Sequence, residues 1–458
     1  MKREVVEELR RIVGEEWVIT DKERISSYLV DETAEAVRPK PSKNVVLVKP
    51  KNANEISEIM KLANREKIPV FPRGGGTGLV GGCIPTEKGI IISLERLDKI
   101  EIDKENLMAV AEAGVTLGRL IQEAEKNGLF FPAHPGDEGA QIGGLIACNA
   151  GGARAVKTGV MRNYVKGIEV VLPTGEILNL GGKLIKNNTG YNLLQLFIGS
   201  EGTLGIITKA IIRLYPRYGA TLTLVAPFNN RLDAINTVPK ILQSGVIPLA
   251  LEYVERDLVE RSAEYLGLTW PCSEGTAFLI ITIAEANEET AYAQSEKIYD
   301  ICIENGSLEP LVAERRDEQE NILKIRSEIY TVLKPDTIDI LDVTVPPANI
   351  GKLLNKIEEI GKKYGIYIPA YGHAGDGNIH PHVMKIEGWT MDKYEQVIKE
   401  IYKAAIELGG VITGEHGIGA LRRKYLGLCL SEKEIEIMRE IKRLLDPNNI
   451  LNPGKVLP

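Results

Sequence analysis

The chain of 458 residues has few cysteines and no long apolar run. Its five cysteines are far apart and form no C-x-x-C pair, which excludes a disulfide framework and a cysteine-ligated iron–sulfur cluster. No stretch reaches the roughly 18 apolar residues of a membrane-spanning helix. The charged start Met1–Arg11 also lacks the apolar centre of a signal peptide. We therefore expect a cytoplasmic protein, with any attachment to a membrane made through a partner.

A basic excess is also missing, because the formal net charge is −7, whereas nucleic-acid binding needs a basic face. Aromatic residues make up only 5% of the chain, but there are 45 glycines. Clustered glycines mark backbone that turns sharply or comes close to a ligand. The chain is also too long for one ordinary core. We therefore expect two large domains and a ligand site built from glycine-rich loops.

Strand-like and helix-like segments alternate in the first half of the chain, whereas long amphipathic helices separate apolar strands after about residue 221. Helices packed on an antiparallel sheet fit the second pattern. The apolar runs predict strands at Val45–Val48, Ile68–Pro72, Gly89–Ser93, Met108–Ala113, Ile206–Tyr215, Phe278–Ile283, Ile338–Val345 and Ile379–Val383. The periodicity predicts helices at Ala53–Glu66, Thr116–Asn127, Arg231–Gln243, Ala286–Glu304, Asp317–Leu333, Ile350–Tyr364 and Ser431–Leu445.

The first glycine-rich loop, Arg73–Gly82, contains the spacing G-x-G-x-x-G of dinucleotide-binding proteins. In those proteins the turn opens directly into a helix, but here Gly82 and Pro85 follow and a strand comes next. No Gly-Lys-Ser/Thr closes the loop, which argues against a nucleotide P-loop. The interpretations that remain are a flexible loop and a nest of backbone amides that faces an anion, with Arg73 at its mouth.

Five more glycine-rich motifs lie between residues 135 and 206. They are Pro135-Gly136-Asp137, Gln141-Ile142-Gly143-Gly144, Asn149-Ala150-Gly151-Gly152, Asn188-Thr189-Gly190-Tyr191 and Gly199–Ile206. A protein that binds a single phosphate does not need so many, whereas a long ligand with a pyrophosphate, a ribityl chain and a flat ring does. The glycine pattern therefore predicts a large dinucleotide-like cofactor.

Four of the five histidines lie between residues 373 and 416, in two motifs rich in glycine. The motifs are His373-Ala374-Gly375-Asp376-Gly377-Asn378-Ile379-His380-Pro381-His382 and Gly414-Glu415-His416-Gly417-Ile418-Gly419. His380 and His382 are two residues apart on the strand expected there, so they share one face. We expect His373 to fold back over Gly375–Gly377 and meet them. Imidazole and carboxylate groups bind Zn²⁺, Mn²⁺ or Fe²⁺, and three such ligands with one open position are typical of a catalytic metal. A single histidine is more often structural, but the cluster favours a metal or a catalytic role.

Three of these glycine-rich stretches resemble the FAD-binding domain of the vanillyl-alcohol oxidase / p-cresol methylhydroxylase family: Pro72–Gly78, Ile142–Gly152 and Gly199–Ile206. The histidine motifs resemble the branch of glycolate oxidase catalytic subunits and D-lactate dehydrogenases, and the resemblance covers essentially the whole chain. It implies an α+β fold with a two-part FAD-binding domain in residues 1–218. A cap domain with an antiparallel sheet and helices would follow in 219–412. Residues 413–458 would complete the active site and return to the FAD domain.

The resemblance also implies which residues contact FAD. The pyrophosphate would lie against Arg73, Gly74, Gly75, Gly76, Thr77 and Gly78. The ribityl and flavin region would be lined by Pro135, Gly136, Gly143, Gly144, Asn149 and Gly152, and the adenine half by Glu201, Gly202 and Ile206. Several relatives tether FAD through a histidine of the first loop, where this chain has Thr77. We therefore expect FAD to be bound non-covalently, and we interpret His134 as a loop histidine near it.

In metal-containing relatives the ligands correspond to His373, His380 and Glu415, and the general base corresponds to His416. His382 is left as a fourth ligand, a substrate contact or a neighbour of the ligands. The metal would be zinc, iron or manganese. These assignments come from the resemblance, whereas the residues alone indicate only a metal or catalytic cluster.

Two positions bear on the substrate. Arg326 corresponds to an arginine that faces the substrate carboxylate, although an arginine on an amphipathic helix is equally well a solvated residue. Relatives that act on D-2-hydroxyglutarate carry a threonine and a lysine where this chain has Tyr330 and Ile340. That difference favours a smaller substrate. Lys455, near the end of the chain, either approaches the flavin or closes the domain.

We therefore expect an FAD-dependent dehydrogenase that oxidises D-lactate or glycolate to the 2-oxo acid. The chain has no motif for a cluster, a haem or a nicotinamide, so the electrons would pass to an electron-transfer flavoprotein, an iron–sulfur subunit or a quinone. The alternatives are a D-2-hydroxyglutarate-type dehydrogenase and a non-redox FAD enzyme of the alkyl-glycerone-phosphate synthase type. A catalytically silent FAD-binding subunit is a further alternative, but such subunits lack the histidine and glutamate motifs.

Overall fold

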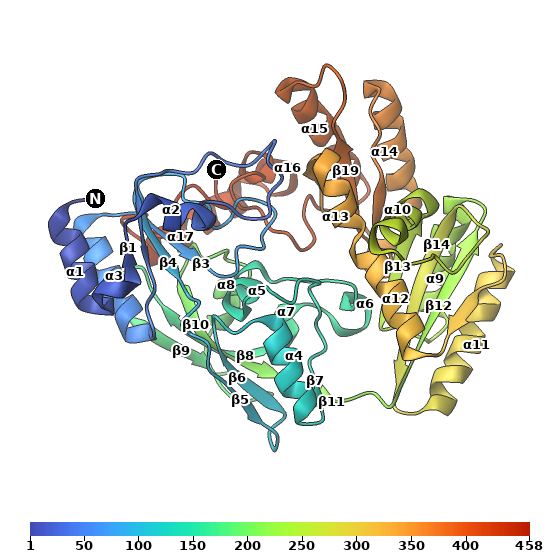
Figure 1. The fold of residues 1–458 in the computed structure, drawn as a ribbon, viewed down its shortest axis with the longest axis horizontal. Helices are drawn as coiled ribbons and strands as arrows, with labels where there is room; N and C mark the ends of the chain where they lie inside the picture. Colours follow the sequence, from blue (N-terminus) through green and yellow to red (C-terminus); the bar gives the residue numbers. More distant parts are fainter. The chain divides into compact units, whose positions relative to one another are not determined.

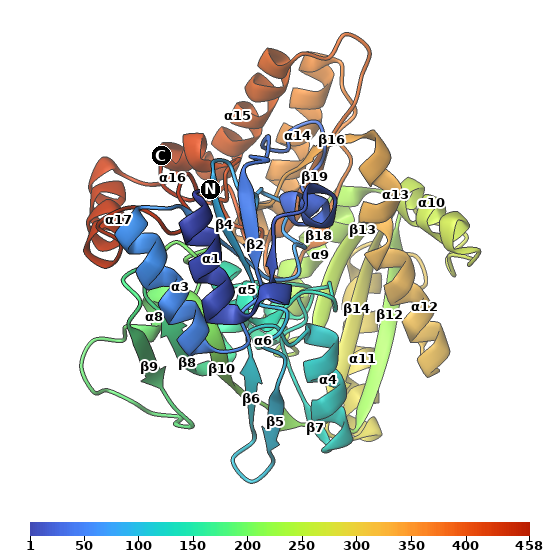
Figure 2. The same cartoon turned by 60° about the vertical axis from the view of Figure 1, so that its left-hand side comes forward.

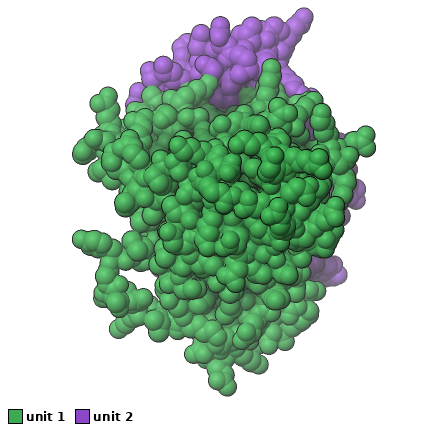
Figure 3. Space-filling view, turned by 90° about the vertical axis from the view of Figure 1, so that its left-hand side faces the viewer, with its two compact units in different colours: residues 1–150, 160–216, 415–458 green, residues 151–159, 217–414 purple.

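The computed structural model describes residues 1–458, and the chain folds into two compact units (Figure 3). Unit 1 contains Met1–Ala150, Val160–Pro216 and Glu415–Pro458, and unit 2 contains Gly151–Gly159 and Arg217–Gly414. The chain thus passes between the units after residues 216 and 414, and the sequence predicted boundaries after 218 and 412. Nothing in the sequence indicates that the short segment Gly151–Gly159 belongs to unit 2. None of the helices combines the length and the apolar character that crossing a membrane requires.

A small sheet in unit 1 carries the first glycine-rich loop. Strand β4 (Gly89–Ser93) lies between β2 (Val45–Val48) and β3 (Val70–Arg73) and runs parallel to both, and β1 (Val18–Ile19) pairs antiparallel with β2. The three parallel strands are almost entirely buried, as expected for parallel strands covered on both faces. The loop that follows β3 leads into another strand, so the expected difference from the Rossmann turn is confirmed.

The second sheet of unit 1 has five antiparallel strands in the order β5-β6-β10-β8-β9, and β7 and β11 form a separate short pair. These strands are β5 (Ile100–Asp103), β6 (Met108–Glu112), β7 (Leu129–Phe130), β8 (Val165–Val171), β9 (Ile177–Gly181), β10 (Ile206–Arg213) and β11 (Tyr215–Pro216). The helices of unit 1 are α1 (Arg3–Val13), α2 (Lys22–Ile25), α3 (Ala53–Glu66), α4 (Leu117–Lys126), α5 (Ile142–Cys148), α7 (Met161–Tyr164), α8 (Leu194–Phe197), α16 (Leu426–Cys429) and α17 (Glu432–Leu445).

Side-chain caps fix where the predicted helices of unit 1 begin. The Asn52 side chain accepts a hydrogen bond from the amide of Glu55 at 2.9 Å at the start of α3. Thr116 accepts from the amide of Arg119 at the start of α4, and Ser431 forms a capping box at the start of α17. Each cap satisfies an amide that the first helical turn leaves without a partner.

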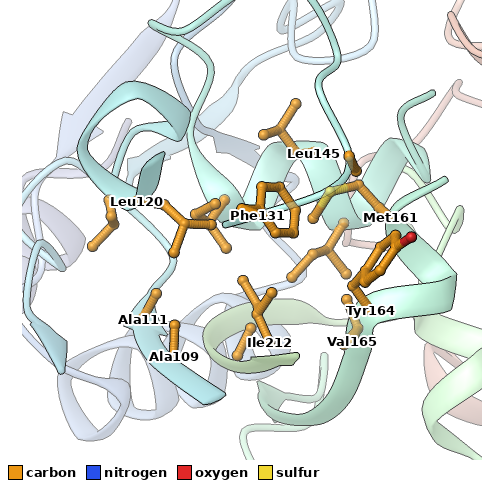
Figure 4. Packing of buried hydrophobic residues seen from close by; sticks show 14 of the residues in the cluster. Ala109, Ala111, Leu120, Phe131, Leu145, Met161, Tyr164, Val165 and Ile212 are labelled. Carbon is orange, nitrogen blue, oxygen red and sulfur yellow. The ribbon is translucent and has the colours of Figure 1, made fainter. Parts of the chain in front are cut away.

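The core of the five-stranded sheet is packed from small residues on one strand and large ones on the helices and on the segment after β7 (Figure 4). Ala109 and Ala111 of β6 leave room for Phe131 and Leu145, and Phe131 meets Tyr164 edge to face at a centroid distance of 5.9 Å. An added Cβ on Gly143 would lie 2.7 Å from the Cβ of Ala113. Glycine is therefore needed for α5 to approach the sheet this closely.

Unit 2 is one eight-stranded sheet covered by helices (Figure 1). All of its strand pairs are antiparallel, in the order β15-β12-β14-β13-β18-β19-β16, and β17 also pairs with β19. The strands are β12 (Ala220–Phe228), β13 (Ala250–Glu255), β14 (Ala277–Glu285), β15 (Leu311–Ala313), β16 (Thr337–Ile340), β17 (Val343–Thr344), β18 (Ala370–His373) and β19 (Asn378–Met384). The helices are α6 (Ala155–Thr158), α9 (Arg231–Gln243), α10 (Arg256–Leu266), α11 (Glu288–Glu304), α12 (Arg316–Ser327), α13 (Ile329–Leu333), α14 (Ile350–Tyr364) and α15 (Met391–Glu407).

Two elements of unit 2 that the sequence predicted as continuous are broken. The helix expected over Asp317–Leu333 divides into α12 and α13, where the Ser327 hydroxyl bonds the carbonyl of Lys324 and competes with the helix ladder. The strand expected over Ile338–Val345 divides into β16 and β17 at Asp342, whose carboxylate binds neighbouring segments. Both breaks come from polar side chains, which hydrophobic periodicity does not register.

Candidate active site

The first and second glycine-rich regions lie against each other in unit 1. A Cβ added to Gly74 would lie 3.8 Å from the Cα of Gly144, and one added to Gly75 would lie 3.0 Å from the carbonyl oxygen of Gly139. The sequence predicted a loop at Gly143 and Gly144, but both residues lie in the first turn of α5. The structure therefore brings these two groups of predicted FAD contacts together.

The guanidinium of Arg73 lies inside the protein rather than at the mouth of the loop. Its Nη1 donates to the carbonyl of Val30 at 2.8 Å, and its Nη2 donates to the carbonyl of Ser27 at 3.1 Å. It also fills the place that a Cβ on Gly76 would take, and Gly76 has a φ of +75°. Arg73 therefore ties the N-terminal segment to the glycine loop in this structure.

The third glycine-rich region lies beside the end of β3. A Cβ on Gly202 would be 2.9 Å from Pro72, and Gly202 adopts a φ of +67°. Asn149 caps α5 with a left-handed φ of 55°, and its side chain accepts a hydrogen bond from the amide of Arg162. The side chain of Ile206 is buried in the core, so only its backbone could face a ligand.

Glu201 binds the segment that follows the second histidine motif. Its carboxylate accepts hydrogen bonds from the amides of Ile418 at 2.8 Å and Gly419 at 2.7 Å. Burial raises the pKa of Glu201, although the two amide donors favour its charged form. The carbonyl of Val80 in the first glycine loop accepts from Ala420. Unit 1 thus holds the backbone just after His416 from two of its glycine-rich loops.

The residues of this glycine-rich surface fit a long polar cofactor such as FAD. Cβ atoms on Gly136 and Gly144 would meet no atom within 4 Å, so these positions face open space. The side-chain oxygen of Gln141 is buried without a hydrogen-bond partner, 3.6 Å from the place of a Gly74 Cβ. A buried acceptor without a donor is costly, and a cofactor hydroxyl or amide would satisfy it. Gly152, the remaining predicted contact, lies in unit 2.

The first histidine motif forms a tight hairpin of β18 and β19 in unit 2 (Figure 2). In this register Tyr371 pairs with His380 and His373 pairs with Asn378. Gly377 closes the turn with a φ of +86°, and a Cβ there would overlap the carbonyl oxygen of Val345. The imidazole rings of His373 and His380 meet edge to face at a centroid distance of 5.3 Å, so the predicted return of His373 to His380 is observed.

A buried glutamate that the sequence analysis missed holds two of the predicted residues. Glu252 on β13 accepts a hydrogen bond from Nδ1 of His373 at 2.7 Å, and its other oxygen lies 2.6 Å from Nε of Arg326. Burial favours the neutral carboxyl, but the charge of Arg326 and the contact with His373 lower the pKa of Glu252 overall. Its one signal in the sequence is its place in an apolar strand, where an isolated carboxylate needs partners.

Asp342, at the break between β16 and β17, connects His380 with the second histidine motif. Its Oδ1 lies 3.7 Å from Nδ1 of His380 and accepts from the side chain of Asn378 at 2.8 Å. Its Oδ2 accepts from the hydroxyl of Thr413 at 2.7 Å and from the amide of Gly414 at 2.9 Å. Gly414 is the last residue of unit 2, and Glu415 follows it directly.

His382 is fully buried among residues that occupy both of its ring nitrogens. Nδ1 lies 3.1 Å from the hydroxyl of Thr337 and Nε2 lies 3.3 Å from that of Tyr371. Its ring stacks on Tyr371 at 5.4 Å and meets Tyr330 at 6.1 Å. Of the three roles left open, a neighbour that supports the ligands fits these contacts best. Ile340 is paired with His382, so this side of the hairpin is largely apolar.

Arg326 lies near the same hairpin and is not a solvated residue. Its guanidinium lies over the ring of Tyr371 at 4.9 Å, and its Nη2 is buried without a hydrogen bond. A buried guanidinium donor without a partner is suited to an anionic oxygen of a ligand. Of the two interpretations left open for Arg326, its position favours an arginine that faces a ligand over a solvated residue.

The remaining predicted residues lie in unit 1. Glu415 and His416 begin its last segment, with the Nε2 of His416 and a carboxylate oxygen of Glu415 3.7 Å apart. His134 is half-buried and lies 3.6 Å from Glu138. Lys455 is buried, donates to the carbonyl of Ile84 at 2.9 Å, and has a pKa that burial lowers to about 8. Its contact inside unit 1 favours the role of closing the domain.

The histidine cluster also fits a divalent cation by the chemistry of its donors. His373 uses Nδ1 for Glu252, which leaves Nε2 as the atom that would bind a metal. His380 has Asp342 beside it, and both are buried. Buried imidazoles with carboxylate partners are the usual surroundings of metal-binding histidines.

Two family models identify the class of protein to which the chain belongs. Residues 45–181 match the family described as an FAD binding domain, and residues 219–456 match the family described as FAD linked oxidases, C-terminal domain. The chain has the fold of p-cresol methylhydroxylase, with a TM-score of 0.78, 18% identity and coverage of 99% of this chain and 96% of that one. An alkyldihydroxyacetonephosphate synthase has the same fold, with a TM-score of 0.76, 20% identity and coverage of 99% and 86%. The predicted α+β fold of this type is confirmed.

Sequence relatives narrow the class. A D-lactate dehydrogenase of Archaeoglobus fulgidus is 46% identical over 94% of this chain and 95% of its own. The glycolate oxidase subunit GlcD of Bacillus subtilis is 40% identical over 90% and 88%. A D-2-hydroxyglutarate dehydrogenase of Stutzerimonas stutzeri is 32% identical over 99% and 98%. The chain belongs to the FAD-linked oxidase family, as an oxidoreductase of the D-lactate, glycolate and D-2-hydroxyglutarate dehydrogenase type.

Proposed function

We propose that this protein oxidises a small D-2-hydroxy acid, D-lactate or glycolate, to the corresponding 2-oxo acid. The observation that carries the proposal is the buried cluster of His373, His380 and Arg326 on and beside the β18–β19 hairpin. The two imidazoles could bind a metal cation, and the guanidinium of Arg326 could bind a carboxylate. A 2-hydroxy acid requires both kinds of group. The relatives named D-lactate dehydrogenase and glycolate oxidase support the same class of substrate.

The residues of this chain would divide the work as follows. Arg326 binds the substrate carboxylate through its outer nitrogens. His416 takes the proton of the substrate hydroxyl as general base, which an imidazole can do near neutral pH. His373, His380 and Glu415 would hold a divalent metal, which supplies positive charge that lowers the pKa of the hydroxyl. Bound FAD supplies the acceptor for two electrons and the α-hydrogen.

FAD would lie along the glycine-rich surface of unit 1, against Arg73–Gly78, Pro135, Gly136, Gly143, Gly144 and Asn149, with Gly152, Glu201, Gly202 and Ile206 as further contacts. Thr77 offers no nitrogen for a covalent link to the flavin. The reduced protein would pass its electrons to an external acceptor, namely an electron-transfer flavoprotein, an iron–sulfur subunit or a quinone.

A dicarboxylate substrate is the main alternative, because one relative is named D-2-hydroxyglutarate dehydrogenase. Tyr330 and Ile340 both lie against His382, and Ile340 is buried. A second carboxylate near these side chains would lose its hydration without gaining a partner, which costs several kcal/mol. The presence of Tyr330 and Ile340, in place of the threonine and lysine of relatives that act on the dicarboxylate, therefore favours the smaller acid.

Oxidation with an artificial electron-accepting dye tests the proposal. We expect kcat/KM for D-lactate or glycolate to exceed that for D-2-hydroxyglutarate by roughly 100-fold, since a loss of 2–3 kcal/mol corresponds to this factor.

Removal of metal with a chelator should abolish the activity, and Zn²⁺ or Mn²⁺ should restore it. Acid should release the flavin as free FAD. Equal kcat/KM for the two classes of acid would reject the proposed substrate, and full activity without metal would reject the metal.

A further inference from the structure

One of the two carboxylates of β13 lies in the middle of the strand, between buried residues. Strand β13 reads Ala-Leu-Glu-Tyr-Val-Glu, and Glu252, its third residue, is 1% exposed. A buried carboxylate is strongly unfavourable unless it is paired. Glu252 has two partners, His373 and Arg326, and both are residues to which the proposed function gives a role. Its position is therefore set by what it binds rather than by the packing of the strand.

The contact with His373 fixes the state of the imidazole. A carboxylate oxygen 2.7 Å from Nδ1 requires that this nitrogen carry the proton. In the neutral ring Nε2 then has no proton and is the only atom able to bind a cation. The ring of His380 meets the ring of His373 edge to face at 5.3 Å, which limits rotation of the His373 ring. Glu252 thus selects both the tautomer and the orientation of His373.

In the contact with Arg326, one part of the guanidinium binds Glu252 and the other part remains for a ligand. Nε is in ion-pair contact with Glu252 at 2.6 Å, and both Nε and Nη2 are buried without an aligned hydrogen bond. The Tyr371 ring covers the guanidinium on one side. The terminal nitrogens are therefore the donors left for a ligand, and the negative charge of Glu252 already offsets part of the positive charge they present.

We propose that Glu252 is a positioning residue that couples the two halves of the site. One carboxylate orients His373 for a divalent cation and Arg326 for the carboxylate of a 2-hydroxy acid or 2-oxo acid. This inference rests on the proposed function for the identity of the cation and the acid. Its specific consequence is that loss of the Glu252 charge weakens binding of the cation, whereas binding of the anion is unchanged or becomes tighter.

Metal binding by the Glu252→Gln variant tests the first half. The variant keeps the side-chain volume but loses the charge, and an amide can present a donor to Nδ1. We expect its affinity for Zn²⁺ or Mn²⁺, measured by competition with a chelator, to fall 10- to 100-fold, as is usual when a partner of a metal-binding histidine is removed. The matched control is Glu255→Gln on the same strand, whose carboxylate bonds the hydroxyl of Tyr253. The control should bind metal like the wild type.

Binding of pyruvate to the metal-free, FAD-containing protein tests the second half, read from the perturbation of the flavin spectrum. We expect Glu252→Gln to bind pyruvate as tightly as the wild type or several-fold more tightly, because Arg326 loses its internal counter-charge. A residue that only supports the fold would weaken both ligands together. Wild-type metal affinity in Glu252→Gln, or a parallel loss of metal and pyruvate, would overturn the proposal.

A measurement on the wild-type protein tests whether Glu252 sets the tautomer of His373, even if the variant does not fold. Nitrogen-15 NMR of histidine-labelled, metal-free protein reports which ring nitrogen of His373 carries the proton, with His373→Asn used for assignment. We expect the Nδ1–H tautomer, and a dominant Nε2–H tautomer would overturn the role of Glu252. If the wild type binds no metal, the metal of the proposed function fails, whereas the tautomer still tests Glu252 separately.

Discussion

Polar side chains around the histidine hairpin are buried as sets of partners. Glu252 joins His373 with Arg326, and Asp342 lies beside His380 while it holds Gly414. Such sets are stable only when each member is satisfied, because a lone buried charge costs several kcal/mol. The carboxylates therefore determine where the imidazoles and the guanidinium can lie.

His416 is the residue whose chemistry is tested most simply. We expect His416→Ala to lower the rate of flavin reduction by D-lactate on the order of 10²- to 10⁴-fold, the usual effect of losing a general base. The FAD content should stay unchanged, because Glu201 binds the following backbone rather than the imidazole. Stopped-flow measurement under anaerobic conditions gives the rate. A rate near that of the wild type would remove His416 from the mechanism.

Lys455 provides a test that depends on pH. Its pKa in the folded protein is about 8, below the ordinary value of 10.5, because it is buried. The unfolded chain therefore binds more protons between these values, so the contribution of Lys455 to stability rises as the pH increases through this range. From pH 8 to pH 10 the gain is on the order of 2 kcal/mol.

We expect thermal unfolding to show this gain as a rise in the Tm of the wild type relative to Lys455→Met between pH 8 and pH 10. Lys433→Met removes an exposed lysine and should show no such trend relative to the wild type. A constant difference between the wild type and Lys455→Met across this range would contradict the assigned burial.

Residue types and motifs in the sequence were sufficient to select most of the candidate site. His373 and His380 were predicted to meet because the glycines between them allow a tight turn, and they do. Glu252 was missed because it lies 121 residues from His373 and 74 residues from Arg326 and belongs to no motif. Contacts of that range depend on strand order, and nothing in the local pattern states that β13 lies beside β18.

Helices and strands were predicted best where a single periodicity extends from one cap to the other. The bounds of α3, α9 and α14 agree with the sequence, and so do those of β2 and β4. Prediction failed where a polar side chain interrupts the backbone, as at Ser327 and Asp342. It also failed for α5, because glycines inside a helix look like a loop until the surface on which the helix packs is known.

The β18–β19 hairpin depends on one glycine, and a matched pair of variants tests this. Gly377 and Gly388 both have left-handed φ values, +86° and +71°, so alanine at either should cost about 1–2 kcal/mol. Only at Gly377 would the new Cβ also overlap backbone, the carbonyl oxygen of Val345. We expect Gly377→Ala to lower the unfolding free energy by about 3 kcal/mol or more and to lose metal affinity.

Gly388→Ala should show only the smaller loss and should bind metal normally, because no atom lies within 4 Å of its added Cβ. Denaturant unfolding and chelator competition supply the two readouts. Equal stability of the two variants would show that the hairpin can move, and that the close contact with Val345 does not define it.

At the scale of the whole molecule, the chain builds unit 1 from three segments separated in sequence. The last, Glu415–Pro458, returns to unit 1 after unit 2 is complete and carries Glu415 and His416 at its start. It is held by Glu201 and Val80 at its beginning and by Lys455 near its end. The sequence predicted this return only through resemblance to a family, since composition and periodicity do not indicate which unit a terminal segment joins.

The central claim is that the site oxidises a small D-2-hydroxy acid, and reduction of the flavin without turnover tests it most directly. D-Lactate and L-lactate differ only in configuration, so a site that fixes both the carboxylate and the hydroxyl should present the α-hydrogen of one enantiomer to the flavin. Anaerobic mixing of the purified protein with each acid, followed by visible absorbance, should show much faster bleaching by D-lactate. Equal rates for the two enantiomers, or bleaching by D-2-hydroxyglutarate as fast as by D-lactate, would contradict the account.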